Sequence, residues 1–157
     1  MAELFFKDDG FIPNSQFSVI LTRKMVNLRG VNATEAEVAL KKRGLKTGWN
    51  LEWLWPVFKR PHYHSTTHEA LVVYQGLATL RLGGHRLGKL VKVNQGDAII
   101  IPAGVAHQAV ERTENFQVFG FYPIGAQQWD MRFCSKKERE IALPKLALLG
   151  EPPSFKL

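Results

Sequence analysis

The segment Pro61–Gly76 reads PHYHSTTHEALVVYQG, and it decides both the fold and the candidate site. His62 and His64 are separated by one residue, so in a strand both imidazoles lie on the same face. Imidazole is the commonest metal ligand, and two on one face can bind the same ion. Ser65–Thr67 is long enough for a turn that brings the next strand back antiparallel, which places Glu69 beside the two histidines. The segment therefore predicts three donors to one metal ion.

A second segment, Gly96–His107 (GDAIIIPAGVAH), supplies a fourth donor. The turn at Pro102-Ala103-Gly104 redirects the chain into a strand near His107. Three imidazoles and one carboxylate suit iron, manganese, cobalt, nickel or zinc as divalent ions. In an octahedral shell four protein ligands leave two adjacent positions open, for a chelating substrate or for a substrate and O₂, in contrast to a closed structural zinc site. We therefore expect one divalent transition metal, held by His62, His64, Glu69 and His107.

Short apolar runs, separated by turns rich in glycine and proline, follow the first histidines. The expected strands are Ala70–Tyr74, Leu77–Leu82, Lys89–Val93, Ala98–Ile101, His107–Glu111 and Phe116–Tyr122. Short strands at this spacing are typical of an all-β sandwich or barrel. Trp49–Phe58 (WNLEWLWPVF) precedes them as an extended aromatic segment, in which Pro56 favours an edge strand or a bend. Its three tryptophans could line a pocket, although core or an oligomer interface is the commoner role.

Two short helices are expected outside the barrel. Thr34–Arg43 begins with a capping box between its first residue and Glu37, and Gly44 is a natural residue to end it. Ser135–Leu143 forms the second helix, and Pro144 ends it. Neither helix carries an obvious catalytic residue, so both are interpreted as structural.

The two segments resemble the two sequence motifs of the cupin superfamily. The first motif is matched by the spacing of His62, His64, Glu69 and Gly76. The second motif is matched by the spacing of Gly96, Pro102, Gly104 and His107. Two positions depart from the pattern: Pro56 stands where the first motif begins with glycine, and the asparagine that often follows the second motif is missing. Both departures concern turns rather than ligands.

More of the chain, from about Leu4 to Asp130, is similar to small single-domain bacterial cupins of the YjlB-like kind. The shared stretches are FKDDGFIPN, HYHSTTHE, LGG, GDAIIIPAGVAH, and FYPIGAQQWD at Phe121–Asp130. The resemblance implies an all-β cupin double-stranded β-helix, a jelly-roll barrel, with one short N-terminal and one short C-terminal helix. It also implies one domain over residues 1–157 with a barrel core at about 49–123, one bound divalent metal, and a homodimer paired through outer strands.

Four further residues are candidates for the substrate pocket: Phe58, Arg60, Tyr74 and Phe119. If Arg60 keeps the parity of the two histidines, it points inward near the mouth and can bind an anionic substrate. An outward, solvated Arg60 is the alternative. The aromatic side chains can line the cavity, but a shift of one residue in register would move each to the opposite face.

His68, His85 and Cys134 are not assigned to the site. His68 directly precedes Glu69, so it points to the opposite face of the strand, outside the barrel or behind the metal ligands. His85 lies in the glycine-rich turn Gly83–Gly88 and is expected to be exposed to solvent. Cys134 is the only cysteine, which excludes an internal disulfide, and no neighbour in the sequence marks it as a nucleophile.

Composition and charge limit the partners. The 157 residues carry a net charge of +7, yet no nucleic-acid-binding motif accompanies it, so we interpret the charge as a solvated basic surface. No apolar run reaches the ~20 residues of a membrane-spanning helix, and the N-terminus lacks the features of a signal peptide. The lone cysteine fits a reducing compartment. We expect a cytoplasmic protein that binds a small-molecule ligand or substrate, with no membrane or nucleic-acid partner.

Three functional classes remain open. The leading hypothesis is dioxygenase-type oxidation of a small organic acid or aromatic, with iron coordinating both the substrate and O₂. The second is isomerase or lyase chemistry on a sugar or keto acid, with the ion as a Lewis acid. Cupins of that type usually need an additional His or Tyr acid/base pair, which the sequence does not place. The third is non-catalytic binding of a small molecule anchored by the metal, because a fold alone does not choose among activities.

Overall fold

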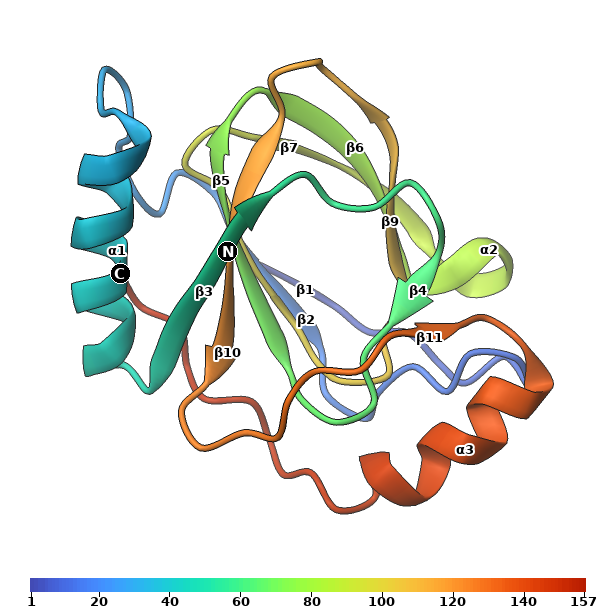
Figure 1. Cartoon of the computed structure of the whole chain (residues 1–157). Coiled ribbons are helices and arrows are strands. Elements are labelled where there is room, and N and C mark those ends of the chain that lie inside the picture. The colour runs from blue at the N-terminus through green and yellow to red at the C-terminus, as the bar shows by residue number, and fades with distance from the viewer.

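Two antiparallel sheets face each other in the computed structural model, which describes all 157 residues (Figure 1). The six-stranded sheet has the order β1 (Ala2–Leu4), β2 (Val19–Thr22), β8 (Ala98–Ile101), β5 (Glu69–Gln75), β10 (Gln117–Pro123), β3 (Trp49–Trp55). The five-stranded sheet has the order β11 (Arg132–Phe133), β4 (His62–Tyr63), β9 (His107–Arg112), β6 (Leu77–Leu82), β7 (Lys89–Asn94). The expected all-β jelly roll is confirmed, and β3 is an edge strand, as Pro56 indicated.

Alternation along the strands builds two apolar cores. In β5, Leu71 and Val73 face the space between the sheets, whereas Ala70 and Val72 face outward. The outward residues are covered by helix α1 (Ala33–Lys46) and by Phe155 of the C-terminal tail, which together with the sheet form the second core. The helix and the C-terminus lie together on this side of the molecule (Figure 1).

The limits of α1 differ from the expected ones. Asn32, rather than Thr34, is the N-cap: its side chain accepts from the Glu35 N–H, and the Glu35 side chain accepts from the Asn32 N–H. Gly44 lies inside the helix instead of ending it. A Cβ on Gly44 would lie 3.0 Å from the ring of Phe121, so the glycine allows the helix to approach the sheet closely. Tertiary packing therefore overrides the usual role of glycine as a helix terminator.

The C-terminal helix α3 (Lys136–Leu146) begins after Ser135, whose side chain accepts from the Glu138 N–H. It continues past Pro144, which was expected to end it. Pro144 has no N–H to donate to the carbonyl four residues earlier, and the helix ends two residues later, at Leu146. A four-residue helix, α2 (Gly84–Leu87), forms in the glycine-rich turn after β6 and was not expected.

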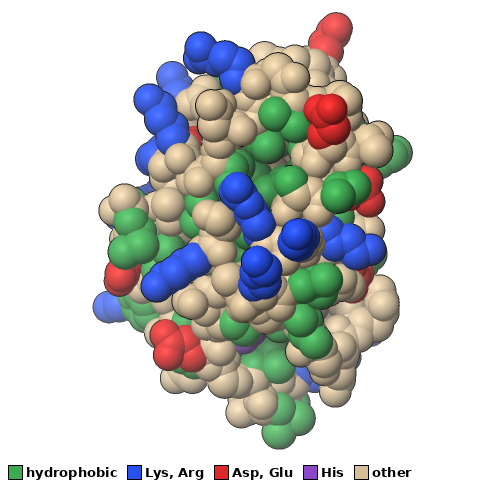
Figure 2. Space-filling model, turned by 90° about the vertical axis from the view of Figure 1, so that its left-hand side faces the viewer, with side chains coloured by type: hydrophobic (Ala, Val, Ile, Leu, Met, Phe, Trp, Pro, Cys, Tyr) green, Lys and Arg blue, Asp and Glu red, His purple; other side chains and the backbone are tan.

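Basic side chains gather on the side of the molecule that carries α1 (Figure 2). The helix contributes four exposed basic residues, Lys41, Lys42, Arg43 and Lys46. None of the helices combines the length and the apolar character that a membrane span requires.

Candidate metal centre

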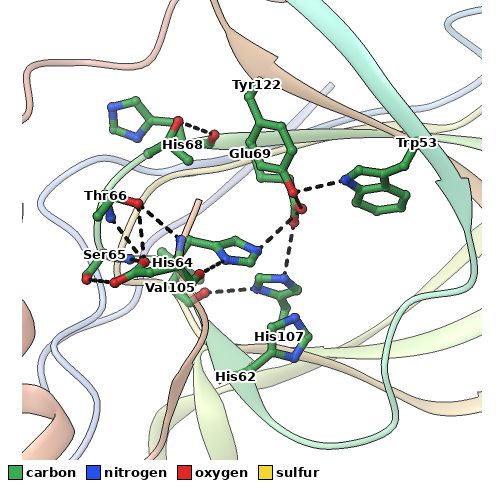
Figure 3. Close-up of polar contacts among 12 residues, drawn as sticks. Trp53, His62, His64, Ser65, Thr66, His68, Glu69, Val105, His107 and Tyr122 are labelled. Carbon is green, nitrogen blue, oxygen red and sulfur yellow. Dashed lines mark hydrogen bonds and ion pairs between the residues drawn. The ribbon is translucent and has the colours of Figure 1, made fainter. Parts of the chain in front are cut away.

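The four predicted donors lie together between the two sheets. His62 on β4 is directly paired with His107 on β9, and their ring centroids are 4.3 Å apart. Glu69 is the first residue of β5 in the opposite sheet, and His64 lies in the β4–β5 connection. The imidazoles of His64 and His107 both point at the Glu69 carboxylate (Figure 3). The candidate site therefore lies between the two sheets, and both sheets contribute side chains to it.

The three histidines lie close enough together to share one ion, and Glu69 contacts two of them. One ring nitrogen from each of the three histidines lies within 4.8 Å of the others. Glu69 Oε2 lies 3.1 Å from His107 Nε2, and Glu69 Oε1 lies 3.4 Å from His64 Nε2. All four side chains are buried, with at most 5% of their surface exposed. A buried cluster of this kind requires a compensating partner for its lone pairs and charge.

Backbone carbonyls select one tautomer for each histidine. The pairs are His62 Nδ1 with Arg60 O (2.9 Å), His107 Nδ1 with Val105 O (3.1 Å) and His64 Nδ1 with Asp130 O. A carbonyl oxygen only accepts, so each Nδ1 carries the proton and donates. The Nε2 atom of each neutral ring is then a lone pair that faces the centre of the cluster, which is how metal-bound histidines are usually oriented.

These lone pairs fit a cation. His64 Nε2 is buried and has no hydrogen-bond partner. In the neutral tautomers, the lone pairs of His64 and His107 face a carboxylate at 3.1–3.4 Å, an arrangement that is repulsive without positive charge. Three neutral nitrogens and one carboxylate are also a donor set that suits divalent transition metals. The residues present therefore fit a divalent transition-metal ion.

The pKa values follow from burial and from mutual charge. Burial, reinforced by the nearby His107, lowers the pKa of His62 to about 3, so this ring is neutral. Burial pushes the pKa of Glu69 upward, but His64 and His107 outweigh it and hold that pKa well below its ordinary value. Burial opposes protonation of His64, yet the charge of Glu69 outweighs it and raises the His64 pKa. The ionised carboxylate thus requires a positive neighbour, either a proton on His64 or a metal ion in its place.

Two further side chains orient the carboxylate. The Tyr122 hydroxyl donates to Glu69 Oε1 (3.0 Å), and the Trp53 indole N–H donates to the Tyr122 oxygen (3.0 Å), as Figure 3 shows. Burial raises the pKa of Tyr122 far above its ordinary value, with the charge of Glu69 adding to the effect, so the phenol remains a donor. Outer hydrogen bonds of this kind typically tune metal affinity.

A β-bulge brings Trp53 into this chain of hydrogen bonds. In the pairing of β10 with β3, Phe121 lies opposite Leu51 and Gly120 lies opposite Trp53, which leaves Glu52 as an extra residue. The bulge reverses the parity of β3, so Trp53 points inward whereas Leu51 points to the outer core. A Cβ on Gly120 would lie 2.1 Å from the Trp53 ring, so only glycine leaves room for the indole.

Asp130 holds the loop that carries His64. Its carboxylate accepts hydrogen bonds from the N–H (2.6 Å) and the hydroxyl of Ser65 and from Arg132 (3.0 Å), while its backbone oxygen accepts from His64 Nδ1. Burial raises the pKa of Asp130, but the hydrogen bonds from Ser65 and Arg132 outweigh it and lower that pKa to about 2. Asp130 is therefore ionised, and it fixes both the loop and the ring.

A cavity of about 260 Å³ opens at the metal donors. Besides the four donors, it is lined mainly by aromatic and apolar side chains, including Trp53, Trp55, Phe58, Tyr122, Trp129 and Met131. Of the residues predicted for the pocket, Phe58 lines the cavity. Trp53, Trp55, Trp129 and Met131 were not predicted as pocket residues, although the tryptophan-rich segment before Pro56 had raised a pocket as one possibility.

The structure places Arg60 outside the cavity. Its guanidinium lies over the ring of Phe133, 3.5 Å from the centroid, and the side chain does not line the cavity wall. Instead, the backbone oxygen of Arg60 accepts a hydrogen bond from His62 Nδ1. Of the two orientations that the sequence left open, the inward one does not occur: Arg60 is exposed, because this stretch precedes the short strand β4 and is not itself a strand.

Tyr74 and Phe119 belong to the outer core and not to the cavity. Their rings pack edge to face at 5.5 Å, and the Tyr74 hydroxyl donates to Val31 O (3.1 Å). The physical reason is strand parity: Glu69 faces inward, so the fifth residue after it faces outward. The same rule places Phe119 on the opposite face from Tyr122 in β10.

His68 and Cys134 have structural surroundings. His68 is buried on the opposite face from the donors, as its position in the sequence predicted; it accepts from the Ala103 N–H (3.0 Å) and donates to Gly150 O (3.0 Å). It thereby ties the C-terminal tail to the turn of the second segment. Burial raises the pKa of the Cys134 thiol to about 11, which keeps it protonated and unreactive. His85 is exposed in α2, as expected.

A fold of two facing antiparallel sheets with a buried cluster of three histidines and a glutamate is the class of structure that the cupin motifs describe. The family model described as "Cupin domain" matches residues 56–119. The uncharacterized protein YjlB of Bacillus subtilis (strain 168) is 36% identical over 149 residues, which cover 94% of this chain and 84% of that protein. The chain therefore belongs to the cupin family, among the small cupins related to YjlB.

Comparison with solved structures finds distant similarity to other proteins. An acireductone dioxygenase from Bacillus anthracis, with a cadmium ion in its active centre, is 14% identical, with a TM-score of 0.46 over 71% of this chain and 82% of its own. The 11S globulin from Wrightia tinctoria is 21% identical, with a TM-score of 0.41 over 54% of this chain. The chain spans only 22% of the length of that globulin. At these levels the similarity supports no conclusion about this chain.

Proposed function

We propose that His62, His64, Glu69 and His107 bind one divalent transition metal and that the protein is a dioxygenase-type oxidoreductase acting on a small organic molecule. The observation that supports this most directly is the buried cluster of three histidines in a mainly apolar cavity, in which the Nε2 atoms of His64 and His107 face the Glu69 carboxylate. When bound, the ion would supply a Lewis acid and, in the case of iron, redox chemistry with O₂.

The chain's own residues prepare this site. Backbone carbonyls orient the three rings, and Tyr122 and Trp53 orient the carboxylate, so the donors lose little freedom when the ion binds. The aromatic walls exclude water from the donors on the cavity side. Four protein donors are fewer than the six positions of an octahedral ion, so positions remain for a ligand that enters from the cavity.

Isomerase or lyase chemistry finds less support in the cavity. Such reactions need a proton donor and acceptor beside the ion. Besides the four donors, Tyr122 is the one titratable side chain that lines the cavity. Its hydroxyl already donates to Glu69, and its pKa is raised far above neutral pH, so it cannot exchange a proton with a substrate at low cost.

The remaining parts of the proposal concern assembly and location. We propose a homodimer paired through an outer strand, because β3 has β10 as its neighbour on one side and no strand on the other. We also propose a cytoplasmic location, in line with the single cysteine. Sedimentation of the purified protein tests the first, and fractionation of cells that produce the protein tests the second.

Metal content is the first experiment. Elemental analysis of protein purified without chelators should find iron, manganese, cobalt, nickel or zinc at about one ion per chain, the stoichiometry of a mononuclear site. His107→Ala should lose the ion. His85→Ala, which removes an exposed histidine elsewhere, is the matched control and should keep it. If His107→Ala retains as much metal as His85→Ala, the site lies elsewhere.

Oxygen dependence separates the proposed activity from binding alone. Iron-loaded protein should consume O₂ in the presence of a substrate, and turnover that persists unchanged under nitrogen rules out oxygenation. Native mass spectrometry of freshly purified protein shows whether a small molecule stays bound. A tightly retained cellular metabolite with no turnover would identify the protein as a metal-anchored binding protein instead.

A further inference from the structure

Some aromatic side chains that line the cavity belong to neither of the two apolar cores. Trp55 is 61% exposed and Phe58 is 44% exposed, although both line the cavity. Large aromatic rings left in contact with water on one concave surface usually mark a site for a ligand. Trp129 and Met131, from the connection between β10 and β11, contribute a second apolar wall.

These rings stand on both sides of the metal donors. Phe58 lies against His62, with ring centroids 5.5 Å apart, whereas Trp129 lies edge-on against His64 at 5.7 Å. Trp129 is also stacked with Tyr122, with an angle of 17° between the rings. A planar molecule that reaches the donors between Phe58 and Trp129 would therefore meet aromatic surface on either side.

The cavity offers little to a charged ligand. No lysine or arginine lines it, because Arg60 is held on Phe133. A carboxylate or phosphate that did not bind the ion itself would lose its hydration without gaining a cationic partner.

It offers as little to a sugar. The Tyr122 hydroxyl and the Trp53 N–H are already paired, with Glu69 and with each other. Most hydroxyl groups of a sugar would then be buried without hydrogen bonds, which costs binding free energy.

We propose that the cavity binds a flat, uncharged aromatic molecule with two neighbouring oxygen donors, such as a catechol, and that Trp129 determines this specificity. The ligand class rests on the proposed function, because the two oxygens would bind the ion; the aromatic walls do not depend on it. A volume of about 260 Å³ is slightly below the ~300 Å³ at which drug-sized pockets begin, so one or two rings fit.

Trp129 suits this role because its backbone is fixed. The carboxylate of the next residue, Asp130, accepts hydrogen bonds from the N–H and the hydroxyl of Ser65. The backbone oxygen of Asp130 accepts a hydrogen bond from His64 Nδ1. The indole is thus held at a set distance from the donors and contacts both a predicted metal ligand and the tyrosine that orients Glu69. Its role is to position the ligand ring, without any part in the chemistry.

The test uses zinc-loaded protein, because zinc has no redox chemistry and the probe is not consumed. Calorimetric titration should show that catechol binds about tenfold or more tightly than 3,4-dihydroxybenzoate, which adds a carboxylate that would be buried without a cation. Ribose should show no binding. If dihydroxybenzoate or ribose binds as tightly as catechol, the assigned ligand class is wrong.

Three variants test whether Trp129 contributes to the affinity for catechol. Trp129→Leu should weaken catechol binding about two- to tenfold, the loss expected for one aromatic contact, with zinc content unchanged. Trp129→Phe should retain most of the affinity for catechol. This result would show that the weaker binding of Trp129→Leu comes from the lost ring and not from a loss of folding. Phe5→Leu, which changes an exposed ring outside the cavity, should behave as wild type. Equal affinities for Trp129→Leu and Phe5→Leu would overturn the role of Trp129.

Metal-free protein separates the two proposals. It should still bind 2-naphthol weakly, and Trp129→Leu should weaken that binding, because the aromatic walls need no ion. If the chain holds no metal but binds 2-naphthol in this way, the aromatic site stands and the metal proposal fails. If zinc binds and neither catechol nor 2-naphthol does, the metal site stands and the ligand class is wrong.

Discussion

The two faces of the six-stranded sheet are both rich in aromatic residues, yet they have different roles. On the outer face Trp49, Phe119 and Phe121 are fully buried beneath α1 and the C-terminal tail. On the inner face Tyr122 lines the cavity beside Glu69, and Trp53 is hydrogen-bonded to it. The same two strands, β3 and β10, contribute to both sets.

This contrast separates stability from function within one sheet. Outer-face rings stabilise the fold because they bury large apolar surfaces. Inner-face rings near the donors are tied by hydrogen bonds to a predicted metal ligand, so their main effect should be on the site. Substitutions on the outer face should therefore change the free energy of unfolding, and substitutions on the inner face should change metal affinity.

The largest expected effect is that of Phe119→Ala on the outer face. Removing this fully buried ring should lower the free energy of unfolding by about 3–5 kcal/mol. Urea unfolding of the metal-free protein measures the loss. The folded fraction should bind metal as tightly as wild type, since Phe119 does not contact the cavity. A large drop in metal affinity with little loss of stability would contradict this prediction and indicate that Phe119 contributes to the pocket.

Tyr122→Phe is the complementary change on the inner face. It removes the hydrogen bond to Glu69 and leaves the Trp53 N–H without its acceptor, so metal affinity should fall about 10–100-fold, as for other residues that orient a ligand. Competition with a chromophoric zinc chelator measures the affinity. Tyr74→Phe is a matched control, because it loses a hydroxyl on the outer face, where the partner is Val31. Equal zinc affinities for the two variants would remove the distinction between the faces.

Much of the fold and the clustering of the three histidines could be predicted because their signals are local. The spacing of His62, His64 and Glu69 and the turn before His107 are each contained in one short segment. Tyr74 could also have been assigned correctly, since an inward Glu69 forces the fifth residue after it to the outer face. Phe119 lies on the outer face because it is three residues before Tyr122, which lines the cavity, and the sequence alone left the register of this strand open.

The aromatic walls could not be predicted in the same way. Trp53 faces the cavity only because the bulge at Glu52 reverses the parity of β3, and the bulge depends on pairing with a strand more than sixty residues away. Trp129 reaches the donors through a long connection without regular structure, held by Asp130 on Ser65. Both positions depend on contacts that are distant in the sequence.

Gly120→Ala tests the bulge directly. The added methyl group would lie 2.1 Å from the Trp53 ring, so the indole must move away from Tyr122. We expect a loss of about 1–2 kcal/mol in stability, within the usual cost of overpacking, together with a several-fold loss of zinc affinity. Gly150→Ala has open space around its Cβ and serves as the control. If Gly120→Ala keeps wild-type zinc affinity, the position of Trp53 does not matter for the site.

Asp130→Asn should have the smallest effect, and the size of that effect depends on pH. The pKa of Asp130 is lowered from 3.8 to about 2 in the folded protein, so the ionised carboxylate stabilises the fold above about pH 4 and this contribution is lost as pH falls toward 2. Because the group is partly exposed, about 1 kcal/mol is expected at neutral pH instead of the full value of the shift.

Urea unfolding at pH 7 and at pH 2.5 measures this contribution. The difference between wild type and Asp130→Asn should shrink at the lower pH, since pH 2.5 lies well below the ordinary pKa of 3.8 and approaches the folded-state pKa of about 2, so most of the stabilisation that the charge supplies is lost. Glu114→Gln, an exposed change with no salt bridge, should show no such difference at either pH. A difference that stays constant between the two pH values would mean that Asp130 holds the His64 loop through shape and hydrogen bonding alone, with no contribution from its charge.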